Sequence, residues 1–246
     1  MSIADKIRQL KQDIDAVFAA GKQAEYGRYW DAFQENGQRT SYSGAFRGAS
    51  WSDALFYPKY DIVAVGSASN MFHGWSTSSP EKKNFDLAAR LEECGVVLDT
   101  SQVTDASNMF AYGTPFTRLP ALDLSKTANS TNVFQACENA VTIDQVAVAE
   151  TTTFTGWFTN DRKLANIIFA GVIANDLNLQ WCPLSKASIS NITGCLSNTA
   201  TGKTLTLKKT AVQKAFETAS GENDGDTSAE WLALAATRNN WTISLV

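Results

Sequence analysis

The chain has 246 residues, of which 44% are hydrophobic and 19% are charged, and this composition excludes an intrinsically disordered chain. A total of 21 Lys and Arg against 25 Asp and Glu gives a net charge of −4, so we expect no nucleic-acid partner. The longest apolar run, residues 167–174, is far shorter than the roughly 20 residues that cross a bilayer. We therefore expect no membrane insertion.

Residues 1–37 predict an N-terminal helical cap made of two helical stretches, the second over residues 23–34. Charges interrupt the start of the chain every few positions, so we expect no signal peptide and synthesis in the cytoplasm. A short coiled coil between protomers is the alternative, and it needs more than the roughly two heptads found here. The apolar face of the first stretch consists of Ile3, Ile7, Leu10, Ile14 and Val17.

Residues 38–208 carry a recurring pattern in which a β-prone segment leads to a small polar residue and, two positions later, to an apolar anchor. Four of the six intervals between anchors fall in the 20–29 residues typical of leucine-rich repeats. We therefore predict an α/β solenoid, a leucine-rich coil with a parallel β ladder whose anchors form one inner row. The predicted anchors are Phe46, Phe72, Phe110, Phe134, Phe154, Ile192 and Phe216.

Asparagine precedes three of these anchors, at Asn70, Asn108 and Asn132, where its amide can satisfy backbone groups at a bend. Thr152 and Ser190 hold the same place before later anchors. The two intervals of 38 residues predict insertions, and the spacing of apolar residues predicts a helix in each of them, over residues 84–94 and 161–171.

Residues 209–246 predict a C-terminal α/β cap. A helix starts at Lys209, a capping box from Thr227 to Glu230 precedes a second helix, and residues 240–246 alternate like a strand. We expect this strand to close the last coil and to cover an open sheet edge.

The sequence offers no catalytic residues, metal ligands or cofactor motif. The four cysteines show no C-x-x-C spacing, and the same column of the pattern also holds Trp and Gly, so we expect inward-facing free thiols. His73 is the only histidine, no nucleophile-elbow motif accompanies it, and Gly202-Lys-Thr204 lacks the first glycine of a phosphate loop. Residues 222–226 do not match the spacing of a calcium loop.

Aromatic residues near the first coils are the remaining candidates for ligand binding, because aromatic side chains dominate binding hot spots. The alternative is that most of them pack beneath the N-terminal cap. The candidates are Trp51, Tyr57, Tyr60, Tyr112 and Phe116.

The stretches Ser69-Asn-Met-Phe-His-Gly, Ser107-Asn-Met-Phe-Ala-Tyr and Thr131-Asn-Val-Phe-Gln-Ala-Cys resemble the Asn-Met-Phe-x-x-Cys signature of BspA-type bacterial leucine-rich repeats. The ends of the chain, Leu10 to Val17 and Trp231 to Trp241, are similar to those of leucine-rich repeat proteins encoded among phage structural genes. This resemblance implies a surface-exposed binding protein or virion component, with no catalytic residues to carry over.

We therefore expect a non-enzymatic binding or adhesion module, associated with a phage virion or tail, that contacts a host protein or glycan. One alternative is a purely structural particle subunit that docks on other subunits or on its own copies as a homo-oligomer. Another is a bacterial cell-surface repeat protein. An enzyme on the same scaffold would need neighbouring carboxylates, whereas Asp61, Asp99, Asp123 and Asp144 fall in separate coils.

Overall fold

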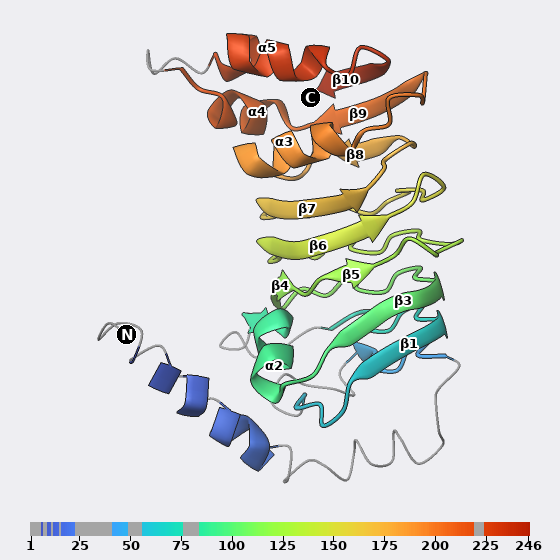
Figure 1. Ribbon diagram of the computed structural model, residues 1–246, viewed down its shortest axis with the longest axis vertical. Coiled ribbons are helices and arrows are strands. Elements are labelled where there is room, and N and C mark those ends of the chain that lie inside the picture. The colour runs from blue at the N-terminus through green and yellow to red at the C-terminus, as the bar shows by residue number, and fades with distance from the viewer. Residues whose placement is uncertain are drawn as a thin grey trace.

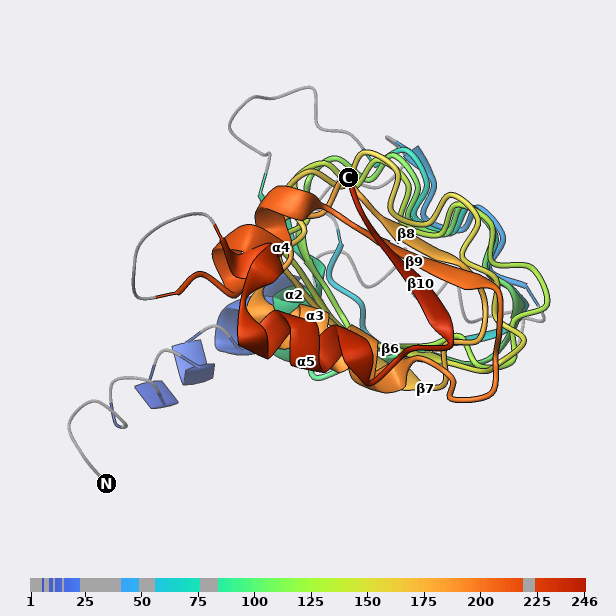
Figure 2. The same ribbon diagram turned by 90° about the horizontal axis from the view of Figure 1, so that it is seen from above.

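The computed structural model of the chain stacks parallel strands along one long axis, with the helices gathered on one side of the stack (Figures 1 and 2). It describes residues 6, 9–10, 12–14, 16–22, 41–48, 56–75, 84–218 and 224–246. Within these ranges every pairing of named strands is parallel. We call each layer along the long axis, with its strand, a level, and the strands of all levels run in the same direction. The fold is α/β with parallel strands, as the sequence predicted.

The strands in the described ranges form three sheets, ordered β1-β3, β2-β4-β6-β5 with β7 on β6, and β10-β9-β8. The strands are β1 (Ile62–Ser67), β2 (Phe85–Asp86), β3 (Leu98–Asp105), β4 (Phe116–Leu119), β5 (Leu122–Asp123), β6 (Thr142–Val148), β7 (Asn166–Gly171), β8 (Leu177–Leu179), β9 (Lys203–Leu207) and β10 (Trp241–Leu245). The helices are α2 (Leu87–Cys94), α3 (Lys186–Cys195), α4 (Lys209–Ala215) and α5 (Ala229–Ala236), with a 3-10 helix, η3 (Gly225–Thr227).

Five six-residue segments adopt the same tight turn at successive levels, and we call them the turn segments. The fourth residue of each has a left-handed backbone, with φ between 54° and 71°. Its N–H donates to the carbonyl of the third residue of the next segment, as Asn108 donates to Thr131 and Asn132 to Thr155, both at 2.8 Å. The turn segments are residues 41–46, 67–72, 105–110, 129–134 and 153–158.

Asparagine or glycine occupies that fourth position because few other residues tolerate a left-handed backbone. The predicted bend asparagines, Asn70, Asn108 and Asn132, all lie there. The Asn132 amide donates to Oδ1 of Asn108 at 3.3 Å, which links two levels. At Gly156 a Cβ atom would come within 1.9 Å of Oδ1 of Asn132, so any larger residue would have to displace that amide.

The sixth residue of every turn segment is a buried phenylalanine, and these rings form one column. Phe72 and Phe110 stack at 5.1 Å between ring centroids, and Phe110 and Phe134 stack at 5.9 Å. Phe46 stacks on Phe72 at 5.1 Å. The rings of Phe46, Phe72, Phe110 and Phe134 therefore stack one on the next.

The column continues through Phe158, and the predicted anchor at Phe154 was wrong. The rings of Phe134 and Phe158 stack at 5.6 Å with an interplanar angle of 13°. Phe154 is buried beside the column, where it meets Trp157 edge-on at 4.9 Å. Thr152 therefore does not hold the bend position, which belongs to Gly156.

The predictions for residues 161–171 and for Ile192 were also wrong. The first range contains strand β7, in which Ile167 and Phe169 are buried and Ile168 is exposed. Ile192 is buried in helix α3, which replaces a strand at the next level. The predicted helix over residues 84–94 is confirmed only for Leu87–Cys94, because Phe85–Asp86 form strand β2. The side chain of Asp86 caps α2 by accepting from the N–H of Ala89.

Helix α3 closes the edge of β7 with side chains. Oγ of Ser188 accepts from the N–H of Ile167 at 2.9 Å. Asn191 accepts from the N–H of Phe169 at 2.7 Å and donates to its carbonyl at 3.2 Å. An unpaired strand edge invites association with other chains, and these bonds satisfy the edge without another strand.

The C-terminal residues follow the predicted order of helix, helix and strand. β10 pairs with β9 in register from Trp241 to Leu245. Ser228 rather than Thr227 caps α5, because its side chain accepts from the N–H of Trp231 at 3.2 Å. Phe216 is buried against the Trp231 ring at 5.4 Å, and it lies outside the phenylalanine column.

The N-terminal helical residues that the structure describes contact the stack through Phe18, whose ring lies 6.3 Å from that of Tyr57. The predicted apolar face points elsewhere: Leu10, Ile14 and Val17 are each more than half exposed. Ile3, Ile7 and the second predicted helical stretch lie outside the described residues.

Candidate binding surface

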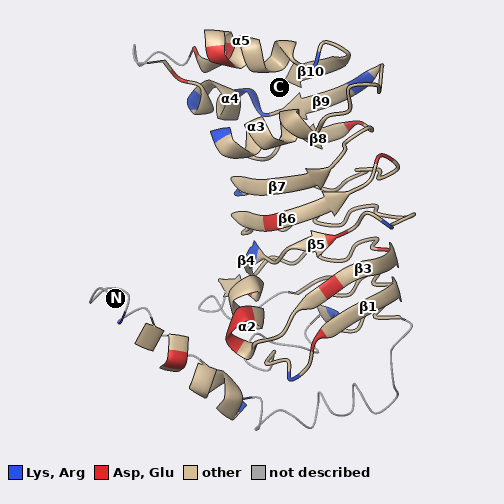
Figure 3. Ribbon diagram, viewed as in Figure 1, with Lys and Arg blue, Asp and Glu red and all other residues tan. Residues whose placement is uncertain are grey.

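Sheet β8-β9-β10 presents a row of hydroxyl and amide side chains to solvent, which we call the hydroxyl face. In β9, Leu205 and Leu207 point into the core, so Thr204 and Thr206 point outward. The parallel register places Asn178 and Ser244 on either side of Thr206. Strands β8 and β10 carry no charged residue along this face (Figure 3).

A shallow hollow of about 410 Å³ adjoins the hydroxyl face where it meets the last turn segment. Its one charged side chain is Asp176, whose Oδ1 accepts from the backbone N–H of Thr204 at 2.7 Å and so serves the sheet. The other polar side chains in its wall are Thr153, Thr155, Asn175, Asn178, Thr204 and Thr206.

The threonine and asparagine side chains of the hollow can donate and accept hydrogen bonds without carrying charge. The surface therefore suits a ligand that presents many hydroxyl groups. It holds no pair of acid and base and no activated nucleophile. Across the described part of the chain, no group of three or more His, Cys, Asp and Glu side chains could hold a metal ion.

The structure does not bring the predicted ligand-binding aromatics together. Phe116 is fully buried and stacks on Trp75 at 5.2 Å between centroids. Tyr57 is 6% exposed, with the guanidinium of Arg90 3.9 Å from its ring centre. Trp51 lies outside the described residues. The alternative of core packing therefore holds for Phe116 and Tyr57.

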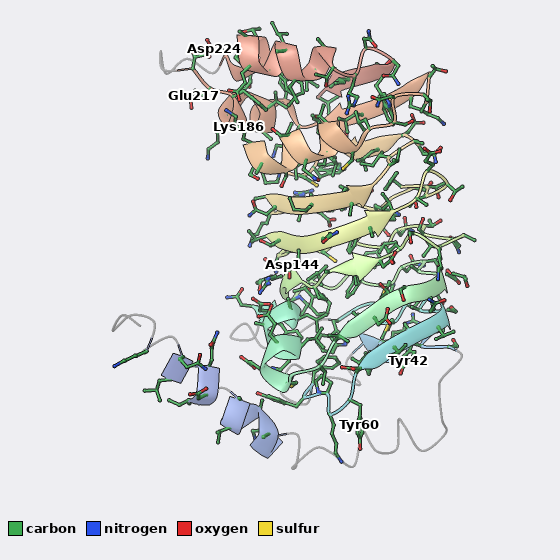
Figure 4. The ribbon with its side chains drawn as sticks, in the orientation of Figure 1. Tyr42, Tyr60, Asp144, Lys186, Glu217 and Asp224 are labelled. Atoms are coloured by element: carbon green, nitrogen blue, oxygen red, sulfur yellow. The ribbon has the colours of Figure 1, made fainter. Side chains whose placement is uncertain are left out.

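Tyr60 and Tyr112 are exposed. Tyr60 lies at the β1 end of the stack and points away from it (Figure 4). Tyr112 is half exposed, has a left-handed backbone with φ of 60°, and meets the His73 ring at 5.5 Å. Burial lowers the pKa of His73, and Arg47 lowers it further, so this histidine is neutral at physiological pH.

A buried carboxyl group that sequence reasoning did not single out lies three residues after Phe158. Asp161 is 1% exposed, and its Oδ1 accepts from the N–H of Cys137 at 2.9 Å. Among the described residues, its Oδ2 has no hydrogen-bond partner. Burial raises the pKa of Asp161 to about 8, so the group is protonated at neutral pH. Because the predicted anchor was Phe154 instead of Phe158, Asp161 was not placed at the inward position three residues after an anchor.

The cysteines are free thiols, as predicted, and two of them neighbour Asp161. Burial raises the pKa of Cys137 and Cys182, and Asp161 raises both further. The thiolate is the reactive form of cysteine, so these two side chains are poor nucleophiles. They act as small apolar residues in the core.

Sequence reasoning missed the hydroxyl face because it followed the inward leucines of each strand. The signal was present in the alternate positions, where Asn178, Thr204, Thr206, Thr242 and Ser244 are all small and uncharged. A face of this composition on three strands in a row is the pattern that would have indicated it.

Comparison of the chain with protein-family models, with curated proteins and with solved structures found no match. Among the described residues, no helix has the length and apolar character to cross a membrane.

Proposed function

We propose that the chain is a leucine-rich-repeat-type solenoid that works as a non-enzymatic binding module for glycans. The five turn segments, with their shared left-handed residue and stacked phenylalanines, support the solenoid. The resemblance to BspA-type and phage leucine-rich repeat proteins supports a virion or bacterial cell surface as its setting.

The composition of the hydroxyl face favours a glycan over a protein as the ligand. Protein interfaces depend on buried aromatic and arginine anchors. The hydroxyl face has none: its outward side chains are Asn178, Thr204, Thr206, Thr242 and Ser244. Neutral donors and acceptors in a regular array match the hydroxyl groups of a sugar chain.

The aspartates that an enzyme would need are engaged in local structure. Oδ1 of Asp61 accepts from the N–H of Val97, and Oδ1 of Asp99 accepts from that of Ser101, both at 2.9 Å. Asp123 accepts from Ser125. Asp144 accepts from Arg118 through two bonds of 2.7 and 2.8 Å, which tie β6 to β4. These contacts favour a structural role for the four carboxylates.

The test is a glycan array followed by titration calorimetry on the best glycan. The double variant Thr204→Val with Thr206→Val keeps the shape of β9 and removes two hydroxyl groups. We expect it to bind about tenfold more weakly, because each lost hydrogen bond contributes roughly 0.5–1.5 kcal/mol. Thr117→Val, in strand β4 of another sheet, is the matched control and should bind like the wild type.

Two results would contradict the glycan-binding function. One is a wild-type chain that retains no glycan on the array. The other is a double variant with unchanged affinity. If the chain instead forms a stable trimer or larger ring in light scattering and binds no glycan, the structural-subunit alternative is favoured.

A further inference from the structure

An open pocket of about 470 Å³ lies at the carboxyl ends of β8, β9 and β10, and we call it the strand-end pocket. Gln180 and Trp181 follow β8, Lys208 follows β9, and Val246 follows β10. This volume falls within the roughly 300–1,000 Å³ of small-molecule sites. The lining residues are Arg162, Gln180, Trp181, Lys208, Thr210 and Val246.

Of the described side chains that line the strand-end pocket, two are cationic and none is acidic. Among the described residues, neither Arg162 nor Lys208 forms an ion pair, whereas Arg118, Lys186 and Lys209 each pair with a carboxylate. The neighbouring Asp161 does not offset this charge at neutral pH, because burial keeps its carboxyl protonated. The terminal carboxyl group of Val246 also lies at the pocket, where its oxygen accepts from the backbone N–H of Lys209 at 2.7 Å, and it offsets one of the two cations. The pocket keeps a net positive charge in a chain of net charge −4, which favours an anion as its ligand.

Trp181 adds a stacking surface to this charge. Its side chain is 36% exposed, and the guanidinium of Arg162 lies 5.4 Å from the ring centre. This cation–π contact orients the guanidinium at the pocket. Indole rings pack against the apolar faces of sugar rings while leaving polar groups solvated. Gln180 and Thr210 supply neutral donors and acceptors at the same pocket.

We propose that the strand-end pocket binds an acidic sugar residue, with its carboxylate on Arg162 and Lys208 and its ring against Trp181. This inference rests on the proposed glycan-binding function and names the class of sugar that the module selects. Arginine suits this role because its planar guanidinium matches a carboxylate with two parallel hydrogen bonds. The adjacent hydroxyl face would hold the neutral sugars next to the acidic one.

Titration calorimetry with three defined probes tests the inference on the full chain. Sialyllactose and a hyaluronan tetrasaccharide carry carboxylates from two kinds of acidic sugar, and lactose is the neutral control. We expect at least one acidic probe to bind and lactose to bind about tenfold more weakly, because a hydrogen bond between charged groups is stronger than a neutral one. Affinity for the acidic probe should fall as salt rises.

Variants locate the interaction. Arg162→Gln and Trp181→Ala should each lower the affinity for the acidic probe about tenfold or more. The first removes the contact with the carboxylate, and the second removes the contact with the sugar ring. Lys163→Gln is the matched control: it removes the next cation along the chain, which is exposed and donates to Asn139 outside the pocket. That control should keep the wild-type affinity, and circular dichroism should show all three variants folded.

Equal affinity for lactose and the acidic probes, or an unchanged affinity in Arg162→Gln, would overturn the inference. So would a wild-type chain that binds neither acidic probe. If glycans bind and only the Thr204→Val with Thr206→Val variant weakens them, the binding function stands and the acidic-sugar pocket fails. The two proposals can therefore fail separately.

Discussion

Replacing Phe110 with alanine is expected to lower the free energy of unfolding by about 3–5 kcal/mol. The ring is fully buried and stacks on Phe72 at 5.1 Å and on Phe134 at 5.9 Å. It also meets Phe116 edge-on at 5.9 Å. Alanine would leave a cavity in the middle of the column, where neighbours on both sides are fixed by their own turn segments and cannot collapse into it. Urea unfolding followed by tryptophan fluorescence measures the loss.

Leu232→Ala is the control for this experiment. Leu232 is 54% exposed on helix α5, so its removal should change stability by less than about 0.5 kcal/mol. Phe110→Leu should fall between the two, because leucine keeps part of the volume. A loss below about 1 kcal/mol in Phe110→Ala, well under the range for a buried aromatic, would show that the rings do not form a continuous column.

Replacing Asp161 with asparagine is expected to raise stability at neutral and alkaline pH. The folded pKa of about 8 lies above the roughly 3.9 of an exposed aspartate, so between these values the folded chain holds a proton that the unfolded chain has released. Wild-type stability therefore falls as pH rises from about 4 to about 8. Asparagine is neutral at every pH and keeps an oxygen to accept from the N–H of Cys137.

The gain in Asp161→Asn should be near zero at pH 4 and should rise by up to about 1.4 kcal/mol per pH unit, to about 5 kcal/mol at pH 8. Unfolding midpoints across this pH range measure it. Asp99→Asn should behave in the opposite way, because backbone and side-chain hydrogen bonds from Ser101 lower the pKa of Asp99. The ionised carboxylate of Asp99 stabilises the wild type above about pH 4, and this stabilisation is lost as pH falls through the folded pKa of Asp99. A pH-independent difference between wild type and Asp161→Asn would contradict the burial of this carboxyl.

Sequence patterns correctly predicted those parts of the fold in which the residue type itself favours the backbone conformation at that position. Asn70, Asn108 and Asn132 lie at the predicted bends because asparagine tolerates the left-handed backbone. The register failed at the next level because two candidates fit the same spacing, Thr152 before Phe154 and Gly156 before Phe158. Glycine favours a left-handed backbone and threonine does not, and this physical argument would have selected Phe158.

The errors at β7 and α3 arose from patterns that fit two structures. Leu164, Ile167 and Ile168 have helical spacing, but Ile167 and Phe169 also alternate like a strand, and pairing with β6 decides the outcome. Asn191 before Ile192 resembles the bend motif. In α3, however, the amide of Asn191 binds the backbone of Phe169, a contact between levels that no local pattern shows.

The candidate binding surface was harder to predict than the core. Burial of leucine and phenylalanine leaves a strong periodic signal, whereas the hydroxyl face is defined by how three separate strands align. Arg162 and Lys208 are 46 residues apart in sequence, and only the stacking of levels brings them to one pocket. Long-range placement of this kind is not encoded in any single segment.

Ring-to-ring nuclear Overhauser effects in phenylalanine-labelled protein test the stacked column most directly. The structure places the Phe134 ring 5.9 Å from that of Phe110 and 5.6 Å from that of Phe158, measured between centroids. We predict cross-peaks from Phe134 to both rings, with each assigned by its loss in a Phe→Leu variant. Cross-peaks from Phe134 to Phe154, with none to Phe158, would contradict the register on which the column, the buried Asp161 and the strand-end pocket all depend.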